Sequence, residues 1–68
     1  MELEELITGK TKVSFRSFCT DSLVEISQKL SNELRNTGDR MRIIAITGLQ
    51  VRVAKVLKAR MFKIEEPE

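Results

Sequence analysis

The sequence predicts a small α/β domain with the element order β-α-β-α-β, and three observations lead to this fold class. The segment Lys12–Cys19 alternates apolar and polar residues with the period of a strand. The segment Asp21–Thr37 carries apolar residues at helical spacing. The segment Arg40–Thr47 is rich in β-branched residues and apolar on both faces, as a central strand is. We therefore expect helices that join neighbouring strands and pack on a short sheet.

The first strand is the least regular of these elements. Its alternation runs from Val13 to Arg16 and fails at Phe18, so we expect a bulge or an early end near Ser17.

The helix over Asp21–Thr37 has clear signals at both ends. Ser22 and Glu25 form a capping-box pattern, and Gly38 stands where a left-handed C-terminal cap is expected. Its apolar stripe consists of Leu23, Ile26, Leu30 and Leu34.

Two structures compete after Gly48, which breaks the predicted central strand. In the first, residues 49–61 form a helix whose basic face is opposite an apolar stripe of Leu49, Val53, Val56, Leu57 and Met61. In the second, Thr47-Gly48 is a hairpin turn, and Leu49, Val51 and Val53 alternate along a returning strand. The propensity and period of residues 54–60 favour the helix. A short final strand, Phe62–Glu65, completes the order.

The length of the chain bounds its organisation. At 68 residues it has room for one domain, which we place at residues 12–65, with an N-terminal arm at 1–11 and an acidic tail at 66–68. In the arm, Leu3, Leu6 and Ile7 have helix-compatible spacing before Gly9. A core this small needs support, and the single Cys19 cannot form an intrachain disulfide, so we expect a homodimer.

Basic residues are concentrated near the C-terminal end. The segment Arg40–Ile64 contains seven and no acid, so the net charge of +2 hides a steep asymmetry. Such a run attracts phosphates or acidic protein surfaces. We expect binding to nucleic acid, DNA or RNA, through backbone phosphates with little sequence preference. The predicted site is Arg40, Arg42, Arg52, Lys55 and Lys58, with outer contacts from Lys10, Lys12, Arg16 and Lys63.

A protein-interaction module is the alternative function, in which the basic second helix contacts an acidic protein partner. A third interpretation is that these cations form the solvated side of an amphipathic helix. Stacking on bases is not expected, because Phe15, Phe18 and Phe62 are predicted to lie in the core.

Other classes of function have little support in the sequence. The chain has no His for general base catalysis, and we expect Cys19 to be a small buried residue, so we predict no enzyme, metal site or cofactor. Charges interrupt every apolar run, which argues against a membrane partner. A lone thiol without a secretory signal predicts a cytoplasmic protein.

The segment from Ile43 to Met61 carries a resemblance to a known family. A predicted strand that ends in Gly48 is followed at once by a helix of apolar and basic residues, AITGLQVRVAKVLKARM. This pattern resembles the second strand and second helix of the archaeal chromatin protein Alba, and the layout is similar over roughly residues 12–65. Stage V sporulation protein S and the C-terminal domain of translation initiation factor three have a similar layout, and a ribosomal S10-like β-α-β opening is a further alternative.

The resemblance implies a nucleic-acid-binding α/β fold, with departures. The Alba family has a lysine pair before its first helix, where this chain has residues 17–21, SFCTD. It has a basic end to its second strand, where this chain has residues 45–48, AITG. It also ends in a long β-hairpin that binds the minor groove, for which this sequence has no residues left. The resemblance therefore implies a reduced Alba-like protein.

Overall fold

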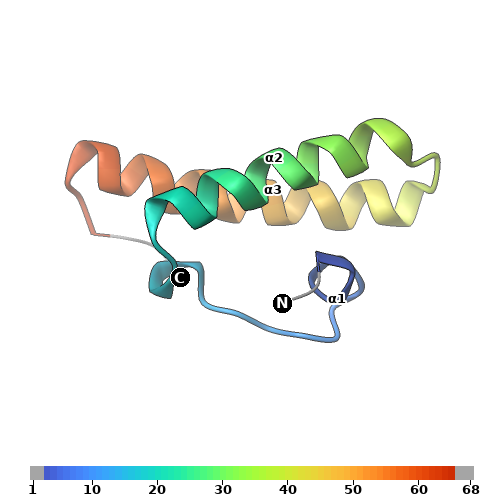
Figure 1. Ribbon diagram of the computed structural model, residues 1–68, viewed down its shortest axis with the longest axis horizontal. Coiled ribbons are helices and arrows are strands. Elements are labelled where there is room, and N and C mark those ends of the chain that lie inside the picture. Colours follow the sequence, from blue (N-terminus) through green and yellow to red (C-terminus); the bar gives the residue numbers. More distant parts are fainter. Residues whose placement is uncertain (1–2, 66–68) are drawn as a thin grey trace.

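The fold is helical, not α/β. The computed structural model describes residues 3–65, and in this range it contains helices and no strand. The predicted α/β class and its β-α-β-α-β order are therefore wrong. The antiparallel helices α2 and α3 lie side by side, and α1 and the 3₁₀ turn η1 lie across one side of this hairpin (Figure 1). The elements are α1 (Leu3–Thr8), η1 (Phe15–Ser17), α2 (Thr20–Asn36) and α3 (Arg40–Phe62).

Helix α3 replaces the predicted central strand, the Gly48 break and the final strand. The helical interpretation of Leu49–Met61 is confirmed, but the helix begins nine residues earlier, at Arg40. Asp39 caps its start by accepting a hydrogen bond from the Met41 N–H at 2.9 Å. At its end, Lys63 takes the left-handed conformation, and the Ile64 N–H donates to the Ala59 carbonyl.

The isoleucines of Arg40–Thr47 favour a strand by propensity, but burial decides otherwise. A strand needs neighbouring strands, and none is formed in the described part of the chain. In the helix, Ile46 lies on the same side as Leu49 and Val53 and is fully buried with Val53. Packing of one helical face thus outweighs the local preference of β-branched residues.

Residues 12–19 also differ from the predicted strand. Phe15 is fully buried and Phe18 is partly buried, and their rings meet edge to face with centroids 5.9 Å apart. The two residues are three apart, and η1 turns once every three residues, so both rings point to the same side. This explains why Phe18 broke the alternation.

Helix α2 matches the predicted helix closely, with different ends. Its N-cap is Cys19, so Ser22 lies in the first turn and the predicted capping box is not formed. Its C-cap, Thr37, is extended, and Gly38 does not have the expected left-handed conformation. By contrast, Gly9 ends α1 as predicted, with a φ of 80°.

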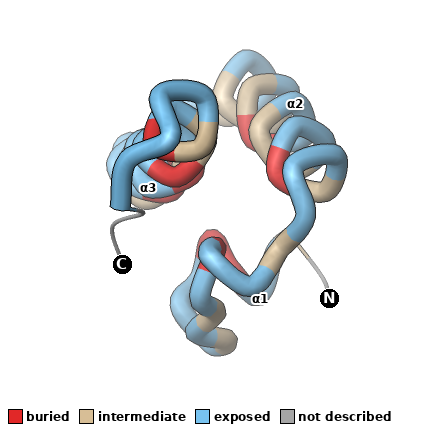
Figure 2. Tube along the Cα trace, turned by 90° about the vertical axis from the view of Figure 1, so that its left-hand side faces the viewer, coloured by how far each residue is buried: buried red, intermediate tan, exposed pale blue. Residues whose placement is uncertain are grey.

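The core lies where α1, η1, α2 and α3 meet, and the inward sides of the helices are the buried ones (Figure 2). The predicted stripe of α2 is confirmed: Leu23 and Leu30 are fully buried, and Ile26 and Leu34 pack against the core. From α1, Leu6 and Ile7 complete the cluster. Met61 and Phe62, which the sequence placed in the core, are exposed. The predicted acidic tail at 66–68 lies outside the described residues.

Replacing Gly48 with alanine tests the continuous α3. Gly48 lies inside the helix, and a Cβ there would meet no atom within 4 Å. We expect Gly48→Ala to raise the free energy of unfolding by about 0.5–1 kcal/mol, since alanine loses less backbone entropy in a helix. Gly9→Ala, at a positive φ, should lower it by about 1–2 kcal/mol. Urea titrations followed by circular dichroism measure both changes, and destabilisation by Gly48→Ala would contradict a helix at this position.

Candidate functional site

Three arginines of α3 hold the N-terminal segment on the helical hairpin. Arg42 donates to both carboxylate oxygens of Glu4 in α1 and, at 3.1 Å, to Glu33 in α2. Its hydrogen bond lowers the pKa of Glu4, and the two carboxylates raise the pKa of Arg42. This ion cluster joins all three α-helices at one end of the molecule.

Arg52 and Arg60 bind backbone carbonyls around η1. Arg52 donates to the Val13 carbonyl at 3.2 Å, and its guanidinium lies 4.8 Å from the centre of the Phe15 ring. Arg60 donates to the carbonyls of Arg16 at 3.0 Å and Phe18 at 2.6 Å. These carbonyls lie outside regular secondary structure or at its edge. The arginines therefore donate hydrogen bonds to backbone oxygens that accept none from an α-helix or a sheet.

The predicted nucleic-acid site is therefore divided. Arg42 and Arg52 interact with the chain itself, on the side of α3 that faces α1 and η1. Arg40 and Lys58 are exposed on the side of the helix opposite Arg42, and Lys55, also exposed, lies about one turn from both Arg52 and Lys58. Of the predicted outer contacts, Lys10, Lys12, Arg16 and Lys63 are all exposed.

The three exposed cations accompany a line of exposed residues that we call the outer stripe. Its six positions, all on α3, are separated alternately by three and four residues, so they follow one side of the helix. The side chain of Ile44 is 61% exposed, that of Val51 46% and that of Met61 75%. The helix surface turned away from α2 and α1 is correspondingly exposed in Figure 2. The outer stripe consists of Ile44, Thr47, Val51, Ala54, Lys58 and Met61.

Sequence reasoning missed the outer stripe because it divided the segment at Gly48. Ile44 was placed in a buried strand and Met61 in the core stripe of a shorter helix. The signal was present in the spacing of three and four residues, which becomes visible only when the helix is continued through Gly48.

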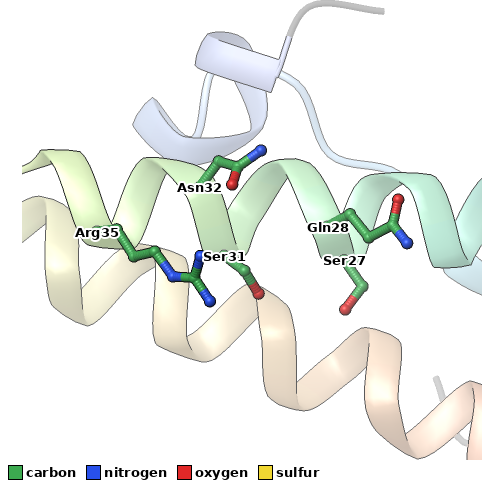
Figure 3. Close-up of a pocket in the computed structure, with 5 residues that line it drawn as sticks. All are labelled: Ser27, Gln28, Ser31, Asn32 and Arg35. Atoms are coloured by element: carbon green, nitrogen blue, oxygen red, sulfur yellow. The ribbon is translucent and has the colours of Figure 1, made fainter.

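A second surface feature lies on α2. Ser27, Gln28, Ser31, Asn32 and Arg35 line an open depression, where Ser27, Ser31 and Arg35 point towards the α3 ribbon (Figure 3). The side-chain amide of Gln50 donates to the Ser31 hydroxyl at 3.0 Å, which links the two helices. This depression lacks apolar side chains that could anchor a ligand.

Cys19 is exposed, contrary to the expectation that it would be buried. Its thiol donates to the Ser22 hydroxyl over 3.1 Å, and hydrogen bonding with the side chain and backbone of Ser22 lowers the pKa of the thiol. The environment of this cysteine contains no histidine, because the sequence has none.

Two other features are absent from residues 3–65. No three acidic, cysteine or histidine side chains of this range gather as they would around a metal ion. None of its helices combines the length and the apolar character needed to cross a bilayer. Comparisons of the chain with protein-family models, with curated proteins and with solved structures found no match.

The Glu4–Arg42 contact predicts a dependence of stability on pH. The folded-state pKa of Glu4 lies below its ordinary value, so the contact stabilises the fold above the ordinary pKa of a glutamate. This stability decreases as the pH falls through the lowered pKa. We expect Glu4→Gln to lower the melting temperature at pH 7, and the difference from the natural chain to shrink below about pH 4.5.

Thermal melts at several pH values measure this difference. Arg42→Gln serves as the control background, because Glu4→Gln should have little effect once the guanidinium is absent. A Glu4→Gln effect that is equally large at pH 7 and at pH 3 would contradict an electrostatic origin.

Proposed function

We propose that this chain is a protein-binding module whose outer stripe docks an amphipathic helix with acidic flanks. The observation that carries the proposal is that one side of α3 exposes apolar residues from Ile44 to Met61, next to cations and without an acid. Exposed apolar side chains that line up along one side of a helix offer a surface on which an amphipathic partner helix can pack.

The arrangement favours a helix as the bound element. Recognition of an amphipathic helix uses anchors separated by three, four and seven residues, which is the spacing of Ile44, Val51 and Met61 with the positions between them. From Ile44 to Met61 the outer stripe is about 26 Å long at 1.5 Å per residue. A partner helix of about 18 residues would cover it.

The charge of α3 selects an acidic partner. Arg40, Lys55 and Lys58 border or belong to the outer stripe, and the helix contains no carboxylate. Opposite charges on the partner would steer association and fix its position. A second copy of α3 would bring only further cations to this surface, so it is a poorer occupant. The homodimer predicted from chain length remains a prediction.

The same geometry favours protein over nucleic acid. A phosphate-binding surface needs a cluster of available cations, whereas Arg42 and Arg52 are bound by the N-terminal segment. The cations that remain exposed on the outer side are separated by Ile44, Val51 and Ala54. Protein interfaces have this composition, with an apolar centre and charged edges. Binding to nucleic acid remains a prediction and forms one arm of the test.

Fluorescence anisotropy with designed helical peptides tests the proposal. The probe is a labelled three-heptad peptide with leucine on one face and glutamate on both flanks; a second peptide carries lysine at the flanks. We expect micromolar binding of the glutamate peptide, and at least tenfold weaker binding of the lysine peptide. Val51→Asp should abolish binding, because it places an unpaired charge at the centre of the outer stripe.

Val24→Asp is the matched control. Val24 lies on α2 and is 41% exposed, close to the value for Val51, so the same substitution there should leave binding unchanged. Equal binding by Val51→Asp and the natural chain would overturn the proposal. So would binding of labelled duplex DNA or structured RNA with no binding of either peptide, and so would a homodimer in sedimentation that Val51→Asp dissociates.

A further inference from the structure

The outer stripe has the geometry of a coiled-coil seam. Its alternating steps of three and four residues give an average period of 3.5, which keeps the seam against one partner helix as the two wind around each other. In this register, Ile44, Val51 and Lys58 take one of the two seam positions, conventionally called a. Thr47, Ala54 and Met61 take the other, called d.

Several side chains near the middle of this seam are small. Thr47 and Ala54 are small, and Gly48 lies beside them with no atom within 4 Å of the place that a Cβ would occupy. A docked helix can therefore approach closely on either side of Val51, between the larger side chains of Ile44 and Met61.

Lys58 is the one charged residue among the six positions of the outer stripe, while Arg40 takes the d position one step before Ile44, at the start of α3. Lys58 is exposed and makes no ion pair or hydrogen bond with residues 3–65 that would hold it away from a partner. A lysine at an a position lowers the stability of a seam but restricts which helix can pair with it. The compensating carboxylate must come from the partner, because α3 contains none.

A second copy of α3 would not supply that carboxylate. Parallel pairing in register would place Lys58 opposite Lys58, and antiparallel pairing, in which a positions face d positions, would place it opposite Thr47, Ala54 or Met61. Both arrangements leave the ammonium without an acidic partner.

We infer that the outer stripe binds its partner as a two-helix coiled coil and that Lys58 determines specificity by pairing with a glutamate at a seam position of that partner. The inference rests on the proposed function and deepens it by assigning the register and the selecting residue. Acidic flanks on the partner alone would make any neighbouring cation equally important, whereas in this register Lys58 is the one cation within the outer stripe.

A charge exchange at one seam position tests the inference. The probes are three-heptad peptides with leucine at every seam position except one, which carries glutamate or lysine and is moved through each a position in turn. We expect the natural chain to prefer the glutamate peptide by roughly tenfold in one register. Lys58→Glu should reverse the preference to the lysine peptide, and Lys58→Leu should remove it while tightening binding of an all-leucine peptide.

Lys55→Glu is the control, because it makes the same change of charge three residues away and outside the seam. It should change the affinity for both peptides by similar factors without reversing their order. Circular dichroism verifies that each variant remains helical, which the exposure of both lysines leads us to expect.

The outcomes separate this inference from the proposed function. If Val51→Asp abolishes binding but Lys58→Glu does not reverse the preference, the face binds a helix and the assigned register is wrong. If Lys55→Glu reverses the preference as well, flank charge rather than the seam determines specificity. If no peptide binds the natural chain, both the function and the register are overturned.

Discussion

Helix α3 carries apolar residues on every side, and this constraint shapes the rest of the fold. One side supplies Ile46, Val53 and Val56 to the core against α2, and an adjacent side contacts α1 and η1. Among residues 3–65 no further element covers the third side. A helix with apolar residues all around its axis is usually buried in full. The outer stripe is therefore exposed because α2, α1 and η1 cover only the other sides of α3.

The basic residues of α3 are also divided between a side that contacts the N-terminal segment and a side that is exposed. Arg42, Arg52 and Arg60 lie towards the N-terminal segment, where they bind Glu4 of α1 and the backbone carbonyls around η1. These contacts keep Leu6, Ile7 and Phe15 on the core. Because the long guanidinium side chains bridge between elements, the basic residues stabilise the fold on one side of α3 and remain available on the other.

The helices α1 and α2 were predictable from local sequence patterns. The continuity of α3 and its contacts with the N-terminal segment were not. The α2 stripe and the end of α1 at Gly9 follow from spacing and from glycine chemistry, and both are confirmed. The strand at Arg40–Thr47 was wrong because isoleucine-rich runs favour strands until a helical partner buries them. The exposure of Lys55 and Lys58 was predictable from the helical period of the apolar residues in 49–61. The partners of Arg42 and Arg52 were not, since Glu4 and Val13 lie 38 and 39 residues away in sequence.

The composition of the outer stripe argues for selective rather than tight recognition. Of its six positions, Thr47 and Ala54 contribute little apolar area, and Lys58 must lose water when a helix covers it. Ile44, Val51 and Met61 then provide the attraction, and they are spread along the helix rather than clustered. A partner that satisfies Lys58 gains both the apolar contacts and an ion pair, whereas one that buries it unpaired loses a large part of that gain. In the proposed binding mode, discrimination between partners thus depends on the single ammonium group of Lys58, whose position on the outer stripe follows from the continuity of α3 through Gly48.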